Sequence, residues 1–318
     1  MTLKTTDILA SDAAGIAAAA DVLRAGGLVA FPTETVYGLG ADARDDRAVA
    51  QVFAAKGRPT FNPLIVHVAD LETAQTLCDF SHEARALAQA FWPGALTLVL
   101  PIRADAGIAP LVIAGLSTLA VRVPDHPVAQ ALLHEFGGPV AAPSANPSGR
   151  ISPTSPDHVI AGLNGRIDAV VDGGNCGVGV ESTIVGCDGS PVLLRAGGLP
   201  REAIAACLGG DPAEGPDGGV LTAPGQMESH YAPQGKVRLN ATDVHDGEVL
   251  LGFGPVDAPL NLSHSGDLVE AAANLFAMLH ELDAMGAQRI AVSPIPMHGL
   301  GAAINDRLAR AAAPRDQA

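Results

Sequence analysis

Short apolar runs alternate with longer amphipathic segments along the chain, from the N-terminus to about residue 200. Such runs are typical of buried strands, and they predict strands at 28–31, 64–68, 96–100, 119–123, 139–143, 169–174, 182–186 and 191–198. The segments between them predict helices at 11–25, 46–55, 71–79, 83–91 and 128–135. Ser11 is expected to cap the first helix, and Gly26 with Gly27 to end it. Because strands and helices follow one another irregularly, we expect a mixed, twisted α/β sheet with flanking helices.

Gly, Pro and Asp are concentrated between residues 209 and 225, a composition that is typical of a linker. A second α/β pattern follows, with strands expected at 237–240, 248–253 and 289–293 and helices at 267–285 and 301–312. This stretch is long enough for a small domain. We therefore expect a large α/β domain at 1–208, a linker at 209–234 and a smaller α/β domain at 235–318.

The chain of 318 residues carries 19 Lys and Arg against 34 Asp and Glu, a formal charge of −15. Such a surface repels a phosphate backbone, so tight nucleic-acid binding is not expected, and an anionic ligand needs a local group of cations. No run of about 18 apolar residues predicts a membrane span, and the N-terminus lacks the pattern of a secretory signal. The cysteines form no CxxC pair, so we expect buried thiols in a reducing compartment, the cytoplasm.

Familiar catalytic signatures are absent: the sequence has no GxxxxGK(S/T) loop, no GxGxxG, no GxSxG and no HExxH. The candidates are instead polar loops at the ends of predicted strands. The first, 31–43, presents Thr33, Glu34, Thr35 and Tyr37 before two glycines. It suits a small polar ligand, although an ordinary polar turn has the same pattern.

Cations follow in the next loops. Lys56 and Arg58 come after a predicted helix and before two prolines that stiffen the loop. They suit a phosphate or carboxylate, although the solvated end of a helix also favours cations. His67 lies within an apolar strand, where a satisfied core histidine is the commoner outcome. Arg122 lies between two valines of a strand, so it must leave the sheet or meet an anion.

Further hydrogen-bonding residues are concentrated in a proline-braced loop, which a surface loop would also explain: Ser144, Asn146, Ser148, Ser152 and Thr154. Ser182 begins one predicted strand, and Arg195 ends another before two glycines. His230 and Tyr231 lie near prolines in the linker, which indicates a segment that docks onto the protein. Together these loops predict a site for a small anionic ligand, but no particular reaction.

The segments also resemble, in the same order, the motifs of the threonylcarbamoyl-AMP synthase family. The motifs are PTETVYGLGADA, KGRPxxNPL, WPGALTLVL, VRVP, PSANPSG, VESTIVG and LLRAGG, and they span roughly residues 12–200. That region is similar to the family's YrdC-like catalytic domain. The linker resembles the family's PG…HYAP segment, and GLGAAINDRLARAA resembles the smaller domain of the two-domain form, which implies a Rossmann-like C-terminal fold.

The resemblance implies that L-threonine, bicarbonate and ATP give L-threonylcarbamoyladenylate and pyrophosphate, for threonylcarbamoylation of a tRNA adenosine by separate proteins. It implies threonine binding by Thr33, His67, Arg122, Ser144 and Ser182. It implies ATP binding by Lys56, Arg58, Asn62, Thr118, Asn146, Ser152, Thr154, Arg195 and Tyr231. Lys56 and Arg58 would be the catalytic pair, stabilising charge on the departing phosphates. Mg²⁺ is expected with ATP, held mainly by phosphate oxygens and water rather than by a protein metal site.

Three other functions remain open at this point. A carbamoyltransferase can contain a YrdC-like domain, but such proteins carry cysteine-rich zinc motifs that this chain lacks. An RNA-binding module is disfavoured by the −15 charge and by the small number of lysines, which is three. The third is a sensor of a small ligand that signals through its C-terminal domain. For the linker, a lid that closes over the site and a passive tether are both open alternatives.

Overall fold

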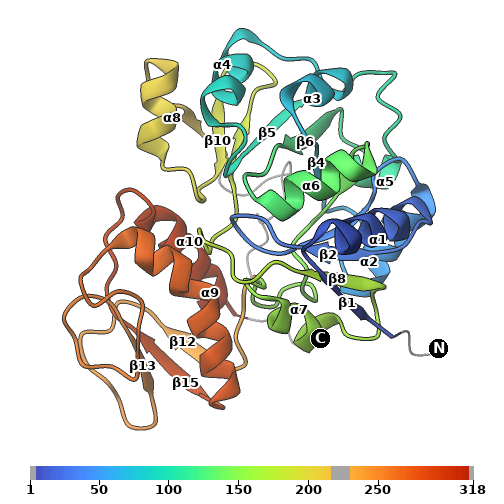
Figure 1. Ribbon diagram of the computed structural model, residues 1–318. Helices are drawn as coiled ribbons and strands as arrows, with labels where there is room; N and C mark the ends of the chain where they lie inside the picture. The colour runs from blue at the N-terminus through green and yellow to red at the C-terminus, as the bar shows by residue number, and fades with distance from the viewer. Residues whose placement is uncertain (1–4, 216–229, 315–318) are drawn as a thin grey trace.

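The computed structural model describes residues 5–215 and 230–314. Figure 1 shows two α/β units side by side, the larger drawn from blue to yellow and the smaller from orange to red. The larger unit is built on an 11-stranded sheet and the smaller on a 4-stranded sheet. The mixed α/β fold that the sequence predicts is therefore confirmed. Within the described residues, no helix is long and apolar enough to cross a lipid bilayer.

The sheet of the larger unit combines parallel and antiparallel pairs in the order β1-β8-β2-β3-β7-β4-β6-β5-β9-β10-β11. Its strands are β1 (Asp7–Ala10), β2 (Val29–Phe31), β3 (Gly38–Asp42), β4 (Ile65–His67), β5 (Leu96–Pro101), β6 (Thr118–Arg122), β7 (Val140–Ala141), β8 (Ala169–Asp172), β9 (Thr183–Gly186), β10 (Val192–Arg195) and β11 (Ala213–Glu214). Its helices are α1 (Ala13–Arg24), α2 (Asp46–Lys56), α3 (Leu71–Leu77), α4 (His82–Phe91), α5 (Pro110–Ile113), α6 (Pro127–Phe136), α7 (Pro156–Leu163) and α8 (Arg201–Leu208).

Alternation along β2 shows how the sheet is covered on both faces. Ala30 belongs to the apolar cluster that contains buried residues of α2 and α4, whereas Val29 and Phe31 belong to the cluster of α1 and α6. Neighbouring strand residues point to opposite faces of a sheet. Helices therefore pack on both faces, and the ligand site is left to the loops at the strand ends.

Two local details differ from the prediction. The first helix is capped by Asp12, whose carboxylate accepts from the Gly15 amide at 2.9 Å, and not by Ser11. Residues 38–42 form strand β3 where a loop is expected. A Cβ on Gly40 would lie only 2.8 Å from Cε1 of Phe31, so the missing side chain allows β3 to pair closely with β2.

The smaller unit has a fully parallel sheet in the order β12-β15-β13-β14. Its elements are β12 (Lys236–Arg238), β13 (Val249–Gly252), β14 (Leu260–Asn261), α9 (Leu268–Ala284), β15 (Arg289–Val292) and α10 (Gly301–Ala312). Helix α9 connects β14 to the parallel strand β15, as expected of a Rossmann-like unit, whereas β12, β13 and β14 follow one another without a helix between them. Asp267 caps α9 by accepting from the amides of Val269 and Glu270.

The two units share apolar packing. Val36, Ile151 and Val180 of the larger unit belong to the same buried cluster as Phe276 of α9. Gly179 brings the backbone of the larger unit onto α9 at very short range, because a Cβ at this position would lie 2.3 Å from the Ala272 carbonyl oxygen. The smaller unit is thus seated directly against the loop that leads into β9.

Substitution of Gly179 by alanine is expected to loosen this seat. Gly179 has a φ of +77°, so an L-residue is strained there even before the clash with α9. We expect the free energy of unfolding in urea to fall by about 2–4 kcal/mol. Gly177→Ala is the matched control, since a Cβ there meets nothing within 4 Å. Equal stability of the two variants would show that the close approach to α9 is unimportant.

Candidate active site

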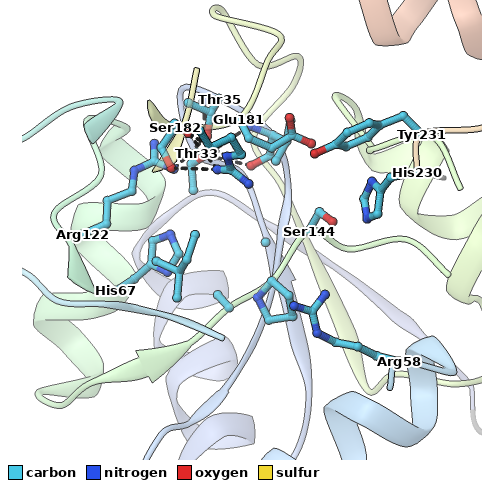
Figure 2. Close-up of a pocket in the computed structure, with 16 residues that line it drawn as sticks. Thr33, Thr35, Arg58, His67, Arg122, Ser144, Glu181, Ser182, His230 and Tyr231 are labelled. Atoms are coloured by element: carbon cyan, nitrogen blue, oxygen red, sulfur yellow. Dashed lines mark hydrogen bonds between the residues drawn. The ribbon is translucent and has the colours of Figure 1, made fainter. Parts of the chain in front are cut away.

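A pocket lies where the loop after β2, the ends of β4 and β6, the start of β9 and the end of β10 meet (Figure 2). It is lined by all five residues that the resemblance implies for threonine: Thr33, His67, Arg122, Ser144 and Ser182. Of the residues implied for ATP, three line it: Arg58, Arg195 and Tyr231. Segments that are far apart in the sequence therefore meet at one place.

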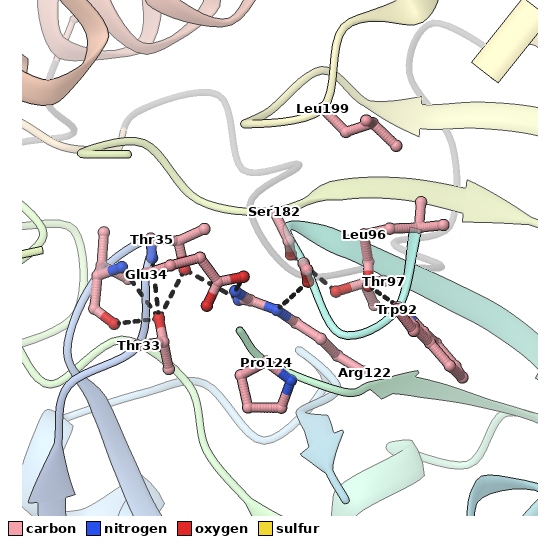
Figure 3. A network of polar contacts seen from close by, with 12 residues as sticks. Thr33, Glu34, Thr35, Trp92, Leu96, Thr97, Arg122, Pro124, Ser182 and Leu199 are labelled. Atoms are coloured by element: carbon pink, nitrogen blue, oxygen red, sulfur yellow. Dashed lines mark hydrogen bonds and ion pairs between the residues drawn. The ribbon is translucent and has the colours of Figure 1, made fainter. Parts of the chain in front are cut away.

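Arg122, at the end of β6, meets an anion from its own chain (Figure 3). Its Nη2 donates to Oε1 of Glu34 at 2.5 Å, its Nη1 donates to Thr35 Oγ1 at 2.9 Å, and its Nε donates to the Gly94 carbonyl at 3.2 Å. The side chain is almost fully buried. A guanidinium has five N–H groups, so two remain without a partner among the described residues and can donate to a ligand carboxylate.

The loop that carries Glu34 is shaped by its own hydroxyl groups. Thr33 donates from Oγ1 to the Val36 carbonyl at 2.7 Å and contacts Thr35 Oγ1 at 2.8 Å. The Val36 amide donates back to Thr33 Oγ1 at 3.2 Å. The segment is thus a polar turn, and this turn holds Thr33 and Thr35 at the pocket wall.

Lys56 ends α2 and is buried behind the pocket wall. Its Nζ donates to the carbonyls of Ser144 and Asn146, each at 2.5 Å. Gly57 follows in the left-handed conformation, with φ 61°, and turns the chain so that Arg58 enters the pocket. Arg58 is held by the carbonyls of Asn62 and Pro63, at 3.2 and 2.8 Å. Lys56 therefore braces the loop that presents Ser144, and Arg58 is the cation of the pair that lines the pocket.

Arg195 holds the opposite wall. It ends β10, and its Nη2 donates to the Ser182 carbonyl at 2.7 Å and to Ser182 Oγ at 3.3 Å. The Ser182 hydroxyl also contacts Thr97 Oγ1 at 2.7 Å. These contacts fix the rotamer of Ser182 at the start of β9, where the residue lines the pocket.

The cations of the site are held in an environment that disfavours their charge. Burial lowers the pKa of Lys56 well below its usual value, and the nearby Arg58 lowers it further. Burial, offset in part by Tyr231 and reinforced by Arg195, lowers the pKa of Arg58 to about 10. Burial also lowers the pKa of Arg195. Buried cations that repel one another are stabilised by an anion, so the site is electrostatically suited to bind one.

The other residues implied for ATP lie outside the pocket lining. Asn62 lies in the loop that follows Arg58, and Thr118 starts β6 on the same sheet face as Arg122. The remaining three form one loop beside Ser144: Asn146 bonds to the Arg150 carbonyl at 2.8 Å, Ser152 donates to Glu181 Oε1 at 2.6 Å, and Thr154 contacts His158.

His230 and Tyr231 dock at the pocket, as the linker sequence indicates. Tyr231 is buried with a positive φ of 62°, and its ring stacks on Phe276 of α9 at 5.4 Å between centroids. Both residues line the pocket. Residues 216–229 lie outside the described residues, so the choice between a lid and a passive tether is not tested.

Five buried polar atoms have no hydrogen-bond partner among the described residues and lie in or beside this site: Glu34 Oε2, His67 Nδ1, Asn146 Oδ1, His230 Nδ1 and Arg307 Nη2. Buried polar groups are nearly always hydrogen-bonded in proteins. Their concentration here is therefore typical of a site that binds a polar ligand. The sequence places Glu34 in a candidate loop without assigning it a role. Glu181 and Arg307 were not predicted as site residues, since only their distant partners reveal them.

Buried neutral histidines make the stability of the site dependent on pH. Burial, together with Arg122, lowers the pKa of His67 from 6.5 to about 3, and burial lowers that of His230 to about 3. Between about pH 3 and pH 6.5 these histidines are protonated in the unfolded chain but neutral in the folded chain. The free energy of unfolding therefore falls as the pH falls below about 6.5. We expect each histidine to contribute about 1 kcal/mol per pH unit to this loss.

Urea unfolding at about pH 7 and pH 5 checks this expectation. His67→Asn should flatten the pH dependence, whereas substitution of the exposed His264 by asparagine should not. Parallel curves for His67→Asn and the unsubstituted chain would show that His67 is not the origin of the effect.

No cluster of three or more His, Cys, Asp or Glu side chains that could hold a metal occurs within residues 5–215 and 230–314. Glu181, the carboxylate that lines the pocket, already accepts from Ser152 and Arg307. The donor set therefore fits a metal ion that arrives bound to a phosphate ligand, and not one held in a cage of protein side chains.

Fold and site together define an α/β protein with a buried cationic pocket for a small phosphate- or carboxylate-bearing ligand. Comparison with known proteins identifies the family. Residues 21–197 match the family model described as "Telomere recombination" (Sua5, YciO and YrdC), and residues 199–313 match "Threonylcarbamoyl-AMP synthase, C-terminal domain". The chain belongs to the threonylcarbamoyl-AMP synthase family, as its motifs indicate.

Individual relatives match over nearly the whole chain. The threonylcarbamoyl-AMP synthase of Bacillus subtilis is 42% identical over 98% of this chain and 96% of its own length. That of Pyrococcus abyssi is 43% identical over 92% of each chain. The crystal structure of P. abyssi Sua5 complexed with L-threonine superposes with a TM-score of 0.90 at 39% identity, covering 96% of this chain and 98% of that one.

Proposed function

We propose that this enzyme makes L-threonylcarbamoyladenylate and pyrophosphate from L-threonine, bicarbonate and ATP. Full-length relatives named threonylcarbamoyl-AMP synthase support the reaction, and the P. abyssi relative binds L-threonine. The observation that carries the proposal is the pocket itself. Arg58, Arg122 and Arg195 converge there, buried, in a chain whose formal charge is −15.

The threonine half of the site is assigned to the residues around Arg122. The two N–H groups of Arg122 that have no partner among the described residues would donate to the threonine carboxylate, because paired N–H groups match the two carboxylate oxygens. The neutral His67 has a free Nδ1 that can hydrogen-bond the substrate. Hydroxyl groups complete this half, from Thr33, Ser144 and Ser182.

The ATP half is assigned to the opposite side of the pocket and the loops beside it: Lys56, Arg58, Asn62, Thr118, Asn146, Ser152, Thr154, Arg195 and Tyr231. Arg58 and Arg195 would contact the phosphates. Lys56 would act from behind, by fixing the loop of Ser144 and adding its charge when an anion is present. Mg²⁺, bound mainly to the phosphates and to water, would neutralise part of their charge.

The reaction requires no protein nucleophile, and the enzyme contributes mainly by positioning the substrates. Bicarbonate takes up a proton and loses water to give carbon dioxide. The threonine amine adds to the carbon of carbon dioxide and loses a proton, which forms a carbamate and balances the proton taken up by bicarbonate. A carbamate oxygen then forms a bond to the α-phosphorus of ATP, and the bond to the β-phosphate oxygen breaks as pyrophosphate leaves. Lys56 and Arg58 stabilise the charge that develops on the departing pyrophosphate.

The product is a small activated intermediate, so the chain can serve tRNA modification without binding tRNA tightly. Separate proteins would transfer the threonylcarbamoyl group to the tRNA adenosine. We assign catalysis to residues 1–208, the linker and lid to 209–234 and the smaller domain to 235–318. The cytoplasm is the proposed location, in keeping with four cysteines that form no disulfide.

Pyrophosphate release tests the reaction. The purified chain is incubated with ATP, Mg²⁺ and bicarbonate, with and without L-threonine. We expect release that depends on threonine and that falls when bicarbonate is removed. Release that is independent of threonine would contradict the proposed reaction.

A further inference from the structure

A buried arginine of the smaller unit reaches the pocket of the larger one. Arg307, in α10, is fully buried, and its Nε donates to Oε2 of Glu181 at 2.8 Å. Its guanidinium carbon also lies 5.3 Å from the centroid of the Tyr231 ring. Both of these partners line the pocket. Through Arg307, helix α10 therefore contacts two residues of the pocket wall.

Glu181 links this contact to Ser182, which lines the pocket, and to Ser152, which the proposed function assigns to ATP. It directly precedes Ser182, and Figure 2 shows the two side by side at the pocket. Its second oxygen, Oε1, accepts from Ser152 Oγ at 2.6 Å. Burial alone would raise the pKa of Glu181, but Arg307 and Arg195 offset this and hold it at about 2. The carboxylate thus stays ionised and joins the Ser152 loop to the start of β9.

Helix α9 supports the same two loops from the same side. Gly179 and Val180, just before Glu181, pack against it. Its His280 lies with Nε2 3.2 Å from the Ser152 carbonyl oxygen. The smaller unit therefore supports the loops that carry Ser152 and Ser182 through several contacts. Arg307 provides the ion pair among them.

Stability alone does not account for Arg307. Its Nη2 has no partner among the described residues, although the side chain is fully buried. Burying a guanidinium is costly, and replacing a buried ion pair by apolar side chains of similar volume is often neutral or stabilising. A residue needed only for packing would be served as well by an apolar side chain. A role in orienting Glu181 explains why a charged side chain occupies this buried position.

We propose that Arg307 is a positioning residue for the active site, acting from the smaller unit through Glu181 to hold Ser152 and Ser182 in their binding orientation. The inference rests on the proposed function, since it assigns those serines to ATP and threonine. The smaller unit then has a definite role, because substrate binding requires α10 to be docked against Glu181.

A double-mutant cycle in the full-length chain tests this role. Initial rates of pyrophosphate release and calorimetric binding of ATP and L-threonine are measured for Arg307→Gln, Glu181→Gln and the double variant. Arg307→Lys and Arg238→Gln complete the set. Arg238→Gln is the matched control, because Arg238 pairs with Glu248 within the smaller unit and does not line the pocket.

Arg307→Gln should lower kcat/KM about 10- to 100-fold, mostly through a higher KM, because the displaced serines contribute to ground-state binding. The double variant should be no worse than the single ones, since Arg307 acts through Glu181. Arg307→Lys should recover part of the loss, and Arg238→Gln should bind and react normally. If Arg307→Gln does not fold, the comparison of Arg307→Lys with and without Glu181→Gln gives the same answer.

Three results would overturn the inference. Arg307→Gln could retain kcat/KM within about twofold, or the two losses could multiply in the double variant, which would mean independent roles. Weaker binding in the Arg238→Gln control would point to general loosening of the smaller unit. By contrast, an unsubstituted chain that binds neither substrate and releases no pyrophosphate contradicts the proposed function, and with it this inference.

Discussion

Replacement of Lys56 by alanine is expected to lower kcat for adenylate formation at least about 100-fold, the range seen when a preorganised electrostatic group is removed. The side chain supplies two things at once. Its Nζ donates to the carbonyls of Ser144 and Asn146. When an anion is bound, its charge adds to that of Arg58 on the side of the pocket proposed for the phosphates. Initial rates of pyrophosphate release at saturating substrates measure the loss.

Lys236→Ala is the matched control for this result. Lys236 is exposed in β12 of the smaller unit, so its removal should leave the rate unchanged. Circular dichroism should show that Lys56→Ala is folded. A folded Lys56→Ala variant with normal kcat would remove Lys56 from the catalytic residues.

Arg122→Gln is expected to raise the KM for L-threonine about 100-fold. The variant loses the charge assigned to the threonine carboxylate, and charged hydrogen bonds are the stronger ones in proteins. It also leaves Glu34 without its ion-pair partner, so the free energy of unfolding should fall by about 3 kcal/mol. Steady-state rates at varied threonine and urea unfolding measure the two effects separately.

Arg103→Gln provides the comparison for Arg122. Arg103 forms ion pairs with Asp79 and Asp105 on the exposed surface, where such pairs contribute little. It should leave both the KM and the stability close to those of the unsubstituted chain. An Arg122→Gln variant with an unchanged KM for threonine would contradict the assignment of the threonine carboxylate to this residue.

The fold was predictable from sequence because its signals are local. The predicted strand at 96–100 is β5, Leu96–Pro101, and the predicted helix at 46–55 is α2, Asp46–Lys56. Short or glycine-rich elements were missed. The strand β3 depends on Gly40 facing Phe31, a contact between two strands that no local pattern contains.

The candidate site was predictable where polar residues lie at strand ends, as with Thr33, Ser182 and Arg195. Its pairings were not. Arg122 and Glu34 are separated by 88 positions, and Glu181 and Arg307 by 126. Such ion pairs depend on how distant elements pack, and each partner alone is an ordinary charged residue. The loop pattern also predicts that Lys56 faces the ligand, whereas its amine is occupied by two backbone carbonyls.

The strongly negative composition now has a clear relation to the site. The sequence disfavours tight nucleic-acid binding, and the structure places Arg58, Arg122 and Arg195 in one buried pocket. This arrangement favours a small anion over a nucleic-acid backbone. It supports the view that the chain makes an activated intermediate and leaves tRNA to other proteins.

Incorporation of isotopically labelled bicarbonate tests the central claim most directly. The chain is incubated briefly with ATP, Mg²⁺, L-threonine and ¹³C-bicarbonate, and the products are examined by mass spectrometry. We predict an adenylate that contains threonine, AMP and the labelled carbon, formed with pyrophosphate. Turnover of ATP that gives no labelled threonyl adduct of AMP would contradict the proposed reaction.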